Sequence, residues 1–293
     1  MRATAVAGYF YPGDAEGLQQ LVSDCMLRAG AFKKEKSALG GIAPHAGYQY
    51  SGVAAAVTYL SIREMETAHT VVVLGPNHSG GGSLLSLSLD MWETPLGTVE
   101  NNTELGKMIQ AEAKYLDFDE KAHIMEHSIE VQLPFIQMRN QKAKVVPICM
   151  MDQSLGASVD LGKALFNAIS EYGKEVVVVA SSDFSHYVSP ETAKRNDNAA
   201  LSFITGMDAK GFQQRVADRG WSICGYGPIT ALMEYAKRMR CREGEMVYYT
   251  NSGEYGGEKD RVVGYASVVF PKHAGKTDKK AAPKGKKPKK KKK

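Results

Sequence analysis

Hydrophobic residues along the chain fall into two alternating patterns, and the first consists of short runs that are apolar at every position. Runs such as 71–74 and 176–180 predict strands that are buried on both faces of a sheet. The predicted strands are Gly41–Ala43, Thr70–Leu74, Lys144–Met150, Glu175–Ser181, Met246–Thr250 and Val262–Phe270. Alternating leucine and serine in 84–94 predict a further strand or hairpin inserted after the second of these.

The second pattern repeats its apolar residues every three or four positions, which is typical of helices that cover a sheet. The predicted helices are Asp14–Ala29, Ser51–Ile62, Asn102–Tyr115, Ser128–Arg139, Gly156–Tyr172, Pro190–Thr205 and Pro228–Met239. Alternation of strands and helices predicts an α/β fold, a three-layer α/β/α sandwich with a mostly parallel central sheet. No internal repeat or Pro/Ser-rich linker interrupts residues 1–271, so we expect a single domain there.

The net charge of +5 originates at the end of the chain. Of 37 basic and 32 acidic residues, 12 lysines and one aspartate lie in residues 272–293, which leaves 25 basic and 31 acidic residues in the rest. This Lys-rich tail has no large apolar residue, so we expect it to be disordered. It also lacks the aromatic and arginine side chains that recognise nucleic acids, so we expect no specific nucleic-acid binding.

The chain has no run of about 18 apolar residues, and its N-terminus lacks the apolar region of a signal peptide. We therefore expect a cytoplasmic protein that does not span a membrane. Its four cysteines form no C-x-x-C pair, which argues against a zinc knuckle and against a disulfide framework.

Three histidines, His45, His78 and His186, each lie in the turn after a predicted strand. Ligands of open α/β sheets bind beyond the carboxyl ends of the strands, where such turns meet. A single histidine in a turn is most often a hydrogen-bonded or capping residue. Three at equivalent positions leave two interpretations open, namely isolated turn residues or a shared metal or catalytic site.

Other reactive residues lie near these turns. Asp183 precedes His186 by three residues, and His127 lies just before a predicted helix from which it can reach the cleft. Cys224 precedes the helix predicted from Pro228, and the dipole of that helix favours a thiolate. Two imidazoles with an anionic ligand suit non-haem Fe(II), whereas a thiolate as the anion makes Cu(I) or zinc more competitive.

Six motifs occur in order over residues 1–270. They are Ala-Gly-Tyr-Phe-Tyr-Pro (7–12), Ala-Pro-His-Ala-Gly-Tyr (43–48), Leu-Gly-Pro-Asn-His (74–78), Glu-His-Ser-Ile-Glu-Val-Gln-Leu-Pro-Phe (126–135), Ser-Ser-Asp-Phe-Ser-His-Tyr (181–187) and Ile-Cys-Gly-Tyr-Gly-Pro (223–228). Together they resemble the Memo family, whose bacterial and archaeal members are called AmmeMemoRadiSam system protein B.

The resemblance implies a fold similar to that of the class III extradiol, or LigB-like, dioxygenases. Those enzymes hold Fe(II) with two histidines and a glutamate. In Memo proteins the corresponding ligands are two histidines and a cysteine, which implies that His45, His78 and Cys224 bind iron or copper here, with zinc as a further option. The sequence departs from the dioxygenases at Cys224, which stands where they have glutamate.

Three functions stay open at this point. The first is a metal-dependent oxidoreductase of dioxygenase-like ancestry that acts on an unknown small molecule, with catalytic proton transfer by His186, Asp183 and His127. The second is a non-catalytic metal-binding or adaptor protein whose cleft binds a metal, peptide or partner protein. The third is a hydrolase or transferase with Cys224 as its nucleophile. The family name also implies AMMECR-type and radical SAM proteins as partners.

Overall fold

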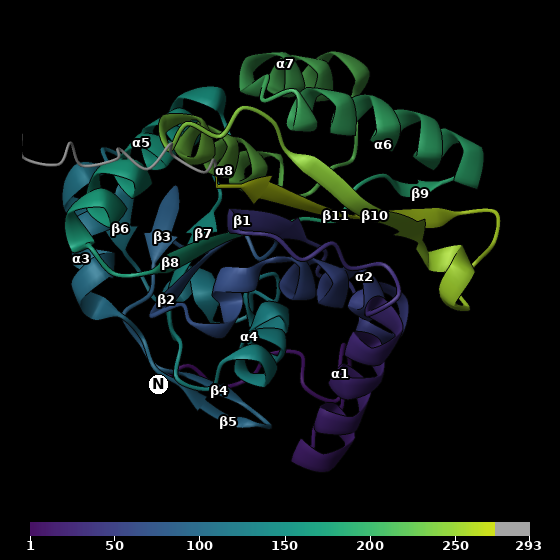
Figure 1. Cartoon of the computed structure of the whole chain (residues 1–293), viewed down its shortest axis with the longest axis horizontal. Coiled ribbons are helices and arrows are strands. Elements are labelled where there is room, and N and C mark those ends of the chain that lie inside the picture. Colours follow the sequence, from purple (N-terminus) through teal and green to yellow (C-terminus); the bar gives the residue numbers. More distant parts are fainter. Residues whose placement is uncertain (273–293) are drawn as a thin grey trace, which may run out of the picture.

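The computed structural model of the protein describes residues 1–272 (Figure 1). The predicted disordered tail, 272–293, lies outside the described residues except for its first lysine. The strands of the main sheet are β1 (Ala38–Ala43), β2 (Thr70–Pro76), β3 (Leu85–Leu87), β6 (Leu116–Phe118), β7 (Lys144–Met150), β8 (Val176–Ser181), β9 (His186–Val188), β10 (Glu245–Asn251) and β11 (Val262–Pro271). A separate hairpin consists of β4 (Trp92–Thr94) and β5 (Gly97–Val99).

The main sheet has the order β10-β11-β1-β8-β2-β7-β3-β6, with β9 paired to β11. Its four central strands, β1, β8, β2 and β7, are parallel to one another. The sheet is nevertheless mixed, because β11 is antiparallel to β1, β9 and β10, and β3 is antiparallel to β7. The prediction of a mostly parallel sheet therefore holds only for the centre. Strands β10 and β11 follow each other without the long helical crossover that parallel neighbours require.

Helices cover both faces of the sheet and complete the predicted three layers (Figure 1). The helices are α1 (Ala15–Ala29), α2 (Tyr48–Ser61), α3 (Thr103–Glu112), α4 (Leu133–Arg139), α5 (Leu155–Tyr172), α6 (Pro190–Thr205), α7 (Ala209–Arg219) and α8 (Tyr226–Arg238). Short 3₁₀ helices span Arg63–Glu66, Lys121–His123, Glu130–Gln132 and Ser252–Tyr255. Helices α1, α2 and α4 pack on one face, and the other five pack on the opposite face.

The central strands alternate between two hydrophobic cores. In β2, Val72 and Leu74 pack into the core beneath α5 and α8, while Val71 and Val73 pack into the core beneath α2. All four side chains are fully buried. This two-sided burial explains why these strands are continuously apolar in the sequence.

Two helical segments differ from the sequence-based prediction. Helix α7 was not predicted, although Asp208 caps its N-terminus and Gly220, with a φ of 60°, ends it. The helix predicted from Ser128 begins later, with a 3₁₀ turn followed by α4. The Ser128 hydroxyl does not cap this helix, because it donates to the carbonyl oxygen of Pro76 instead. No helix among residues 1–272 is both long and apolar enough to cross a membrane.

Close contact between β1 and β8 depends on a glycine. A Cβ atom at Gly40 would lie 1.9 Å from the backbone oxygen of Val178. We therefore expect Gly40→Ala to force the two strands apart and to lower the free energy of unfolding by about 3 kcal/mol. Urea denaturation measures this change.

Gly156→Ala is the matched control. It lies in the first turn of α5, where a new Cβ meets nothing closer than the Ser154 hydroxyl at 4.0 Å. Alanine should stabilise that helix by up to about 1 kcal/mol. Equal losses of stability in the two variants would contradict the role of the close strand contact.

Candidate metal centre

The parallel centre of the sheet brings three turns to one edge. His45 lies two residues after β1, His78 two residues after β2, and Asp183 two residues after β8. Because β8 pairs in parallel with both β1 and β2, the carboxyl ends of all three strands point the same way. The turns predicted to converge therefore lie side by side.

Three imidazoles meet at this edge, those of His45, His78 and His127. One ring nitrogen from each lies within 4.8 Å of the other two. The rings of His78 and His127 stack with centroids 4.7 Å apart, and the ring of His45 stands edge-on to both. His127, expected from the sequence to transfer protons, thus lies among the candidate metal ligands.

A fully buried carboxylate, Glu126, organises two of these rings. It accepts hydrogen bonds from the backbone N–H groups of His78, His127 and Ser128, and from Nδ1 of His78 at 2.9 Å. Burial alone would raise the pKa of Glu126, but the hydrogen bond and charge of His78, with smaller contributions from Ser128 and His127, lower it below its usual range. The group is therefore an anion that holds the Nδ1 proton of His78 and directs Nε2 away from itself.

A hydroxyl fixes the tautomer of His45. The Ser181 hydroxyl donates to the carbonyl oxygen of Ser128 at 2.6 Å and accepts from the side-chain amide of Gln132. Having used its only proton, this hydroxyl must accept from Nδ1 of His45, which lies 2.9 Å away. His45 thus keeps Nε2 unprotonated, and burial together with His127 and His78 lowers its pKa well below the usual range.

Cys224 lies beside this cluster and contacts His45. Its Sγ is 3.0 Å from Nε2 of His45 and accepts from the backbone N–H of Asp183 at 3.1 Å. Burial, followed by the charge of Asp183, raises the pKa of the thiol well above its usual range. The N-terminus of α8 was expected to lower the pKa of this thiol. In the protein without a bound ion, burial outweighs that effect. A bound cation acts in the opposite direction and favours the thiolate.

Asp183 and His186, the other predicted proton-transfer residues, flank the cluster. Buried Asp183 accepts from the backbone N–H of His45 at 2.8 Å, and burial raises its pKa to about 6. His186 begins β9, and its Nδ1 lies 2.7 Å from the carbonyl oxygens of both Phe184 and Ser222. Carbonyl oxygens only accept, so Nδ1 carries a proton and Nε2 is the ring nitrogen that these hydrogen bonds do not use.

A pocket of about 740 Å³ opens over the cluster. His45, His78, His127, Asp183 and His186 all line it, and Cys224 does not. Its other walls include aromatic side chains, one acidic residue and one basic residue, namely Tyr9, Phe10, Tyr50, Tyr187, Tyr265, Glu258 and Arg261. The volume is that of a small-molecule site.

Comparison with known proteins identifies the family. The sequence matches the model of the Memo-like protein family over residues 2–269. This chain belongs to the Memo-like family.

Archaeal relatives support the assignment over nearly the whole chain. A MEMO1 family protein of Methanosarcina mazei is 43% identical over 270 residues, covering 92% of this chain and 98% of that protein. One from Pyrobaculum arsenaticum is 40% identical over 277 residues, covering 92% and 99%. The crystal structure of uncharacterized protein JW3007 from Escherichia coli K12 matches with a TM-score of 0.45 at 11% identity, over 71% of this chain and 91% of that one.

The residues that orient the three imidazoles were not predicted from the sequence. Glu126, Ser181 and Gln132 are polar and fully buried, and each contacts a turn far away in the chain. The one available signal is position, since Glu126 adjoins His127 and Ser181 ends a predicted strand. His123, by contrast, lies apart from the cluster, with Nε2 3.1 Å from the carbonyl oxygen of Ser86.

Replacing Glu126 tests its organising role directly. A glutamine there puts an amide NH₂ among N–H donors, so one or more of the bonds from His78, His127 and Ser128 is lost. We expect Glu126→Gln to lower the free energy of unfolding of the metal-free protein by about 2–4 kcal/mol. Exposed Glu104 on α3 provides the control, and Glu104→Gln should change stability by less than about 0.5 kcal/mol. Equal stability of the two variants is the result that would refute the role.

Proposed function

We propose that this Memo-like protein binds an iron or copper ion through His45, His78 and His127 and uses it to oxidise a small molecule in the overlying pocket. The observation that carries the proposal is the convergence of three ring nitrogens within 4.8 Å at the floor of that pocket. The hydrogen bonds of Glu126 and Ser181 support it, because they occupy Nδ1 of His78 and His45 and so leave Nε2 as the nitrogen available to a metal ion.

The donor set fits a transition metal. Neutral imidazoles bind iron, copper and zinc, and burial lowers the pKa of both His45 and His127, which keeps them neutral. The thiol of Cys224 is an additional candidate ligand, because it touches the same nitrogen of His45 that faces the cluster. A bound iron or copper ion would supply one-electron redox chemistry at the pocket floor.

The surrounding residues would move protons during such a reaction. His186 would exchange protons through Nε2, since its Nδ1 is occupied by backbone oxygens. Asp183, with a pKa of about 6, exchanges a proton near neutral pH. Both line the pocket and can reach a molecule bound there.

Two other functions make different predictions. A non-catalytic metal-binding or adaptor protein would bind the ion without consuming oxygen. A hydrolase or transferase with Cys224 as nucleophile is disfavoured, because the raised pKa keeps the thiol protonated and Cys224 does not line the pocket. AMMECR-type and radical SAM partners and a cytoplasmic location stay predictions.

The first test measures metal content and affinity in protein purified without oxygen and reloaded with Fe(II), Cu(I) or Zn(II). We expect about one equivalent of metal in the unmodified protein and little in His78→Ala or His127→Ala, because each variant loses a ligand. Cys224→Ala tells whether the thiol also binds the metal. His69→Ala is the control, since His69 lies at the end of β2 remote from His78 and is hydrogen-bonded to Tyr172.

Retention of metal by His78→Ala and His127→Ala would contradict the proposed site. If metal binds as expected, an oxygen electrode with a panel of phenolic and other reduced compounds tests turnover. Oxygen consumption that is lost in His186→Ala supports the oxidoreductase. Stoichiometric metal without turnover across the panel would assign the adaptor function instead.

A further inference from the structure

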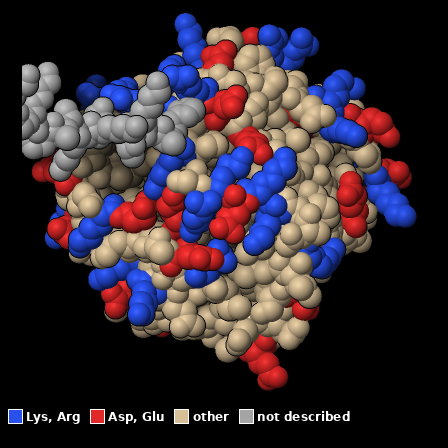
Figure 2. All heavy atoms as spheres, viewed as in Figure 1, with Lys and Arg blue, Asp and Glu red and all other residues tan. Residues whose placement is uncertain are grey.

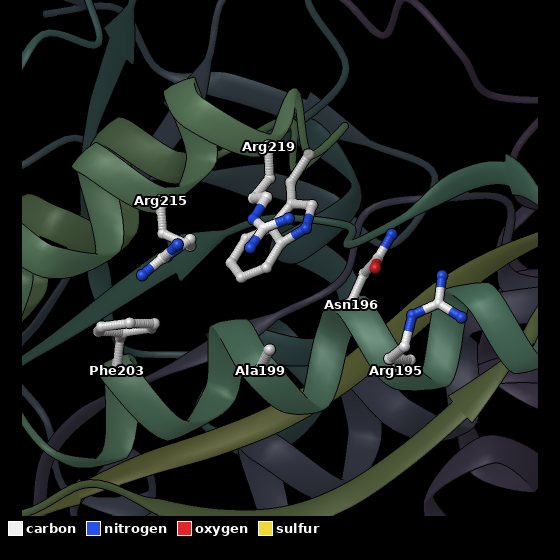
Figure 3. A pocket seen from close by; sticks show the side chains of 7 residues that line it. Arg195, Asn196, Ala199, Phe203, Arg215 and Arg219 are labelled. Atoms are coloured by element: carbon white, nitrogen blue, oxygen red, sulfur yellow. The ribbon is translucent and has the colours of Figure 1, made fainter.

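A second pocket, of about 430 Å³, lies between α6 and α7, and none of its lining residues lines the histidine pocket. Figure 3 shows Arg215 and Arg219 on α7 facing Phe203, Ala199 and Arg195 on α6. We call this the α6–α7 groove. Its side chains are accessible, since Arg195 and Arg219 are exposed and Arg215 is half-buried.

The groove is strongly basic. Arg195, Arg215 and Arg219 all line it, and no carboxylate does. None of the three forms an ion pair within residues 1–272, whereas Arg2, Arg63 and Arg139 elsewhere in the protein do. Along the edge of the molecule formed by α6 and α7, basic and acidic side chains are interspersed (Figure 2), so the excess of positive charge is confined to the groove itself. Three guanidinium groups around one hollow repel one another unless an anion joins them.

The groove also has a flat apolar wall. Phe203 and Trp221 line the groove and are half-buried. Ala199 of α6 is a further apolar lining residue. The guanidinium of Arg215 lies 6.0 Å from the ring centre of Phe203. Aromatic rings and guanidinium planes both stack on flat rings. We propose that the α6–α7 groove binds a small anion that joins a phosphate or carboxylate group to a flat ring.

A short segment of the chain connects the groove with the histidine pocket. Trp221 is followed directly by Ser222, whose hydroxyl accepts from the backbone N–H of His186 and whose carbonyl oxygen accepts from His186 Nδ1. Two residues further on, Cys224 contacts His45. A ligand that shifts Trp221 therefore acts on a segment that holds His186 in place.

The chain provides its own reporter for binding. It has two tryptophans, of which Trp92 is fully buried and Trp221 lines the groove. Quenching of tryptophan fluorescence by acrylamide should therefore report mainly on Trp221. Titration of the full-length protein with phenyl phosphate should be saturable and should protect Trp221, with Trp221→Phe as the check that the signal arises there.

Arginine variants locate the site. We expect Arg215→Gln and Arg219→Gln each to weaken phenyl phosphate binding by about tenfold or more, since each removes a charge-assisted hydrogen bond. Arg63→Gln, on the layer of α1 and α2, should leave the affinity unchanged. Unchanged thermal unfolding in all variants confirms that they fold.

Further probes define the ligand class. Tighter binding of phenyl phosphate than of benzoate assigns a phosphorylated ligand, and the reverse order assigns a carboxylate. Three results would overturn the proposal: no saturable binding of either probe, equal affinity for inorganic phosphate, or equal weakening in Arg63→Gln, which would indicate general attraction of anions. None of these readouts involves metal, so the groove and the histidine site are tested separately.

Discussion

The hydrogen bonds of one buried carboxylate, Glu126, determine how the candidate metal centre is assembled. Glu126 joins the turn after β2 to the loop before α4 by accepting from His78, His127 and Ser128. An ionised carboxylate in a fully buried position is costly unless several donors satisfy it. Once satisfied in this way, it holds two imidazoles stacked with their ring centroids 4.7 Å apart. The geometry of the cluster therefore follows from the need to provide the Glu126 carboxylate with hydrogen-bond donors.

A second buried charge supports the same loop from the N-terminus. Arg2 forms an ion pair with Glu130 and donates to the carbonyl oxygens of His123 and Glu126. Glu130 in turn accepts from the backbone of Ala5 and Val6, which anchors the start of the chain. The same anchoring places Phe10 against the ring of His127, with centroids 4.8 Å apart. The N-terminal segment is thus part of the pocket wall as well as of the fold.

Local patterns in the sequence predict the parts of this structure that depend on local physics. The central strands are predictable because burial on both faces leaves a continuous apolar run, and the predicted and observed bounds of β7 agree at Lys144–Met150. The antiparallel edges of the sheet are not predictable in this way, because β11 pairs with β1, which lies far away in the chain. Likewise, the turns carrying His45 and His78 are predictable from the strand ends. The role of Glu126 is not predictable from local sequence, since its partner His78 lies 48 residues away. Helix α7 is mostly polar, with only Ala209, Phe212 and Val216 buried, so few apolar residues mark it in the sequence. The groove beside it has no sequence signature.

The most direct test of the account is anomalous X-ray diffraction from crystals of metal-loaded protein, with data collected on both sides of the absorption edge of the metal. The account predicts one strong anomalous peak within bonding distance of ring nitrogens of His45, His78 and His127, at the floor of the pocket. A peak bonded to His45 and Cys224 but remote from His127, or no peak at this edge of the sheet, would contradict it.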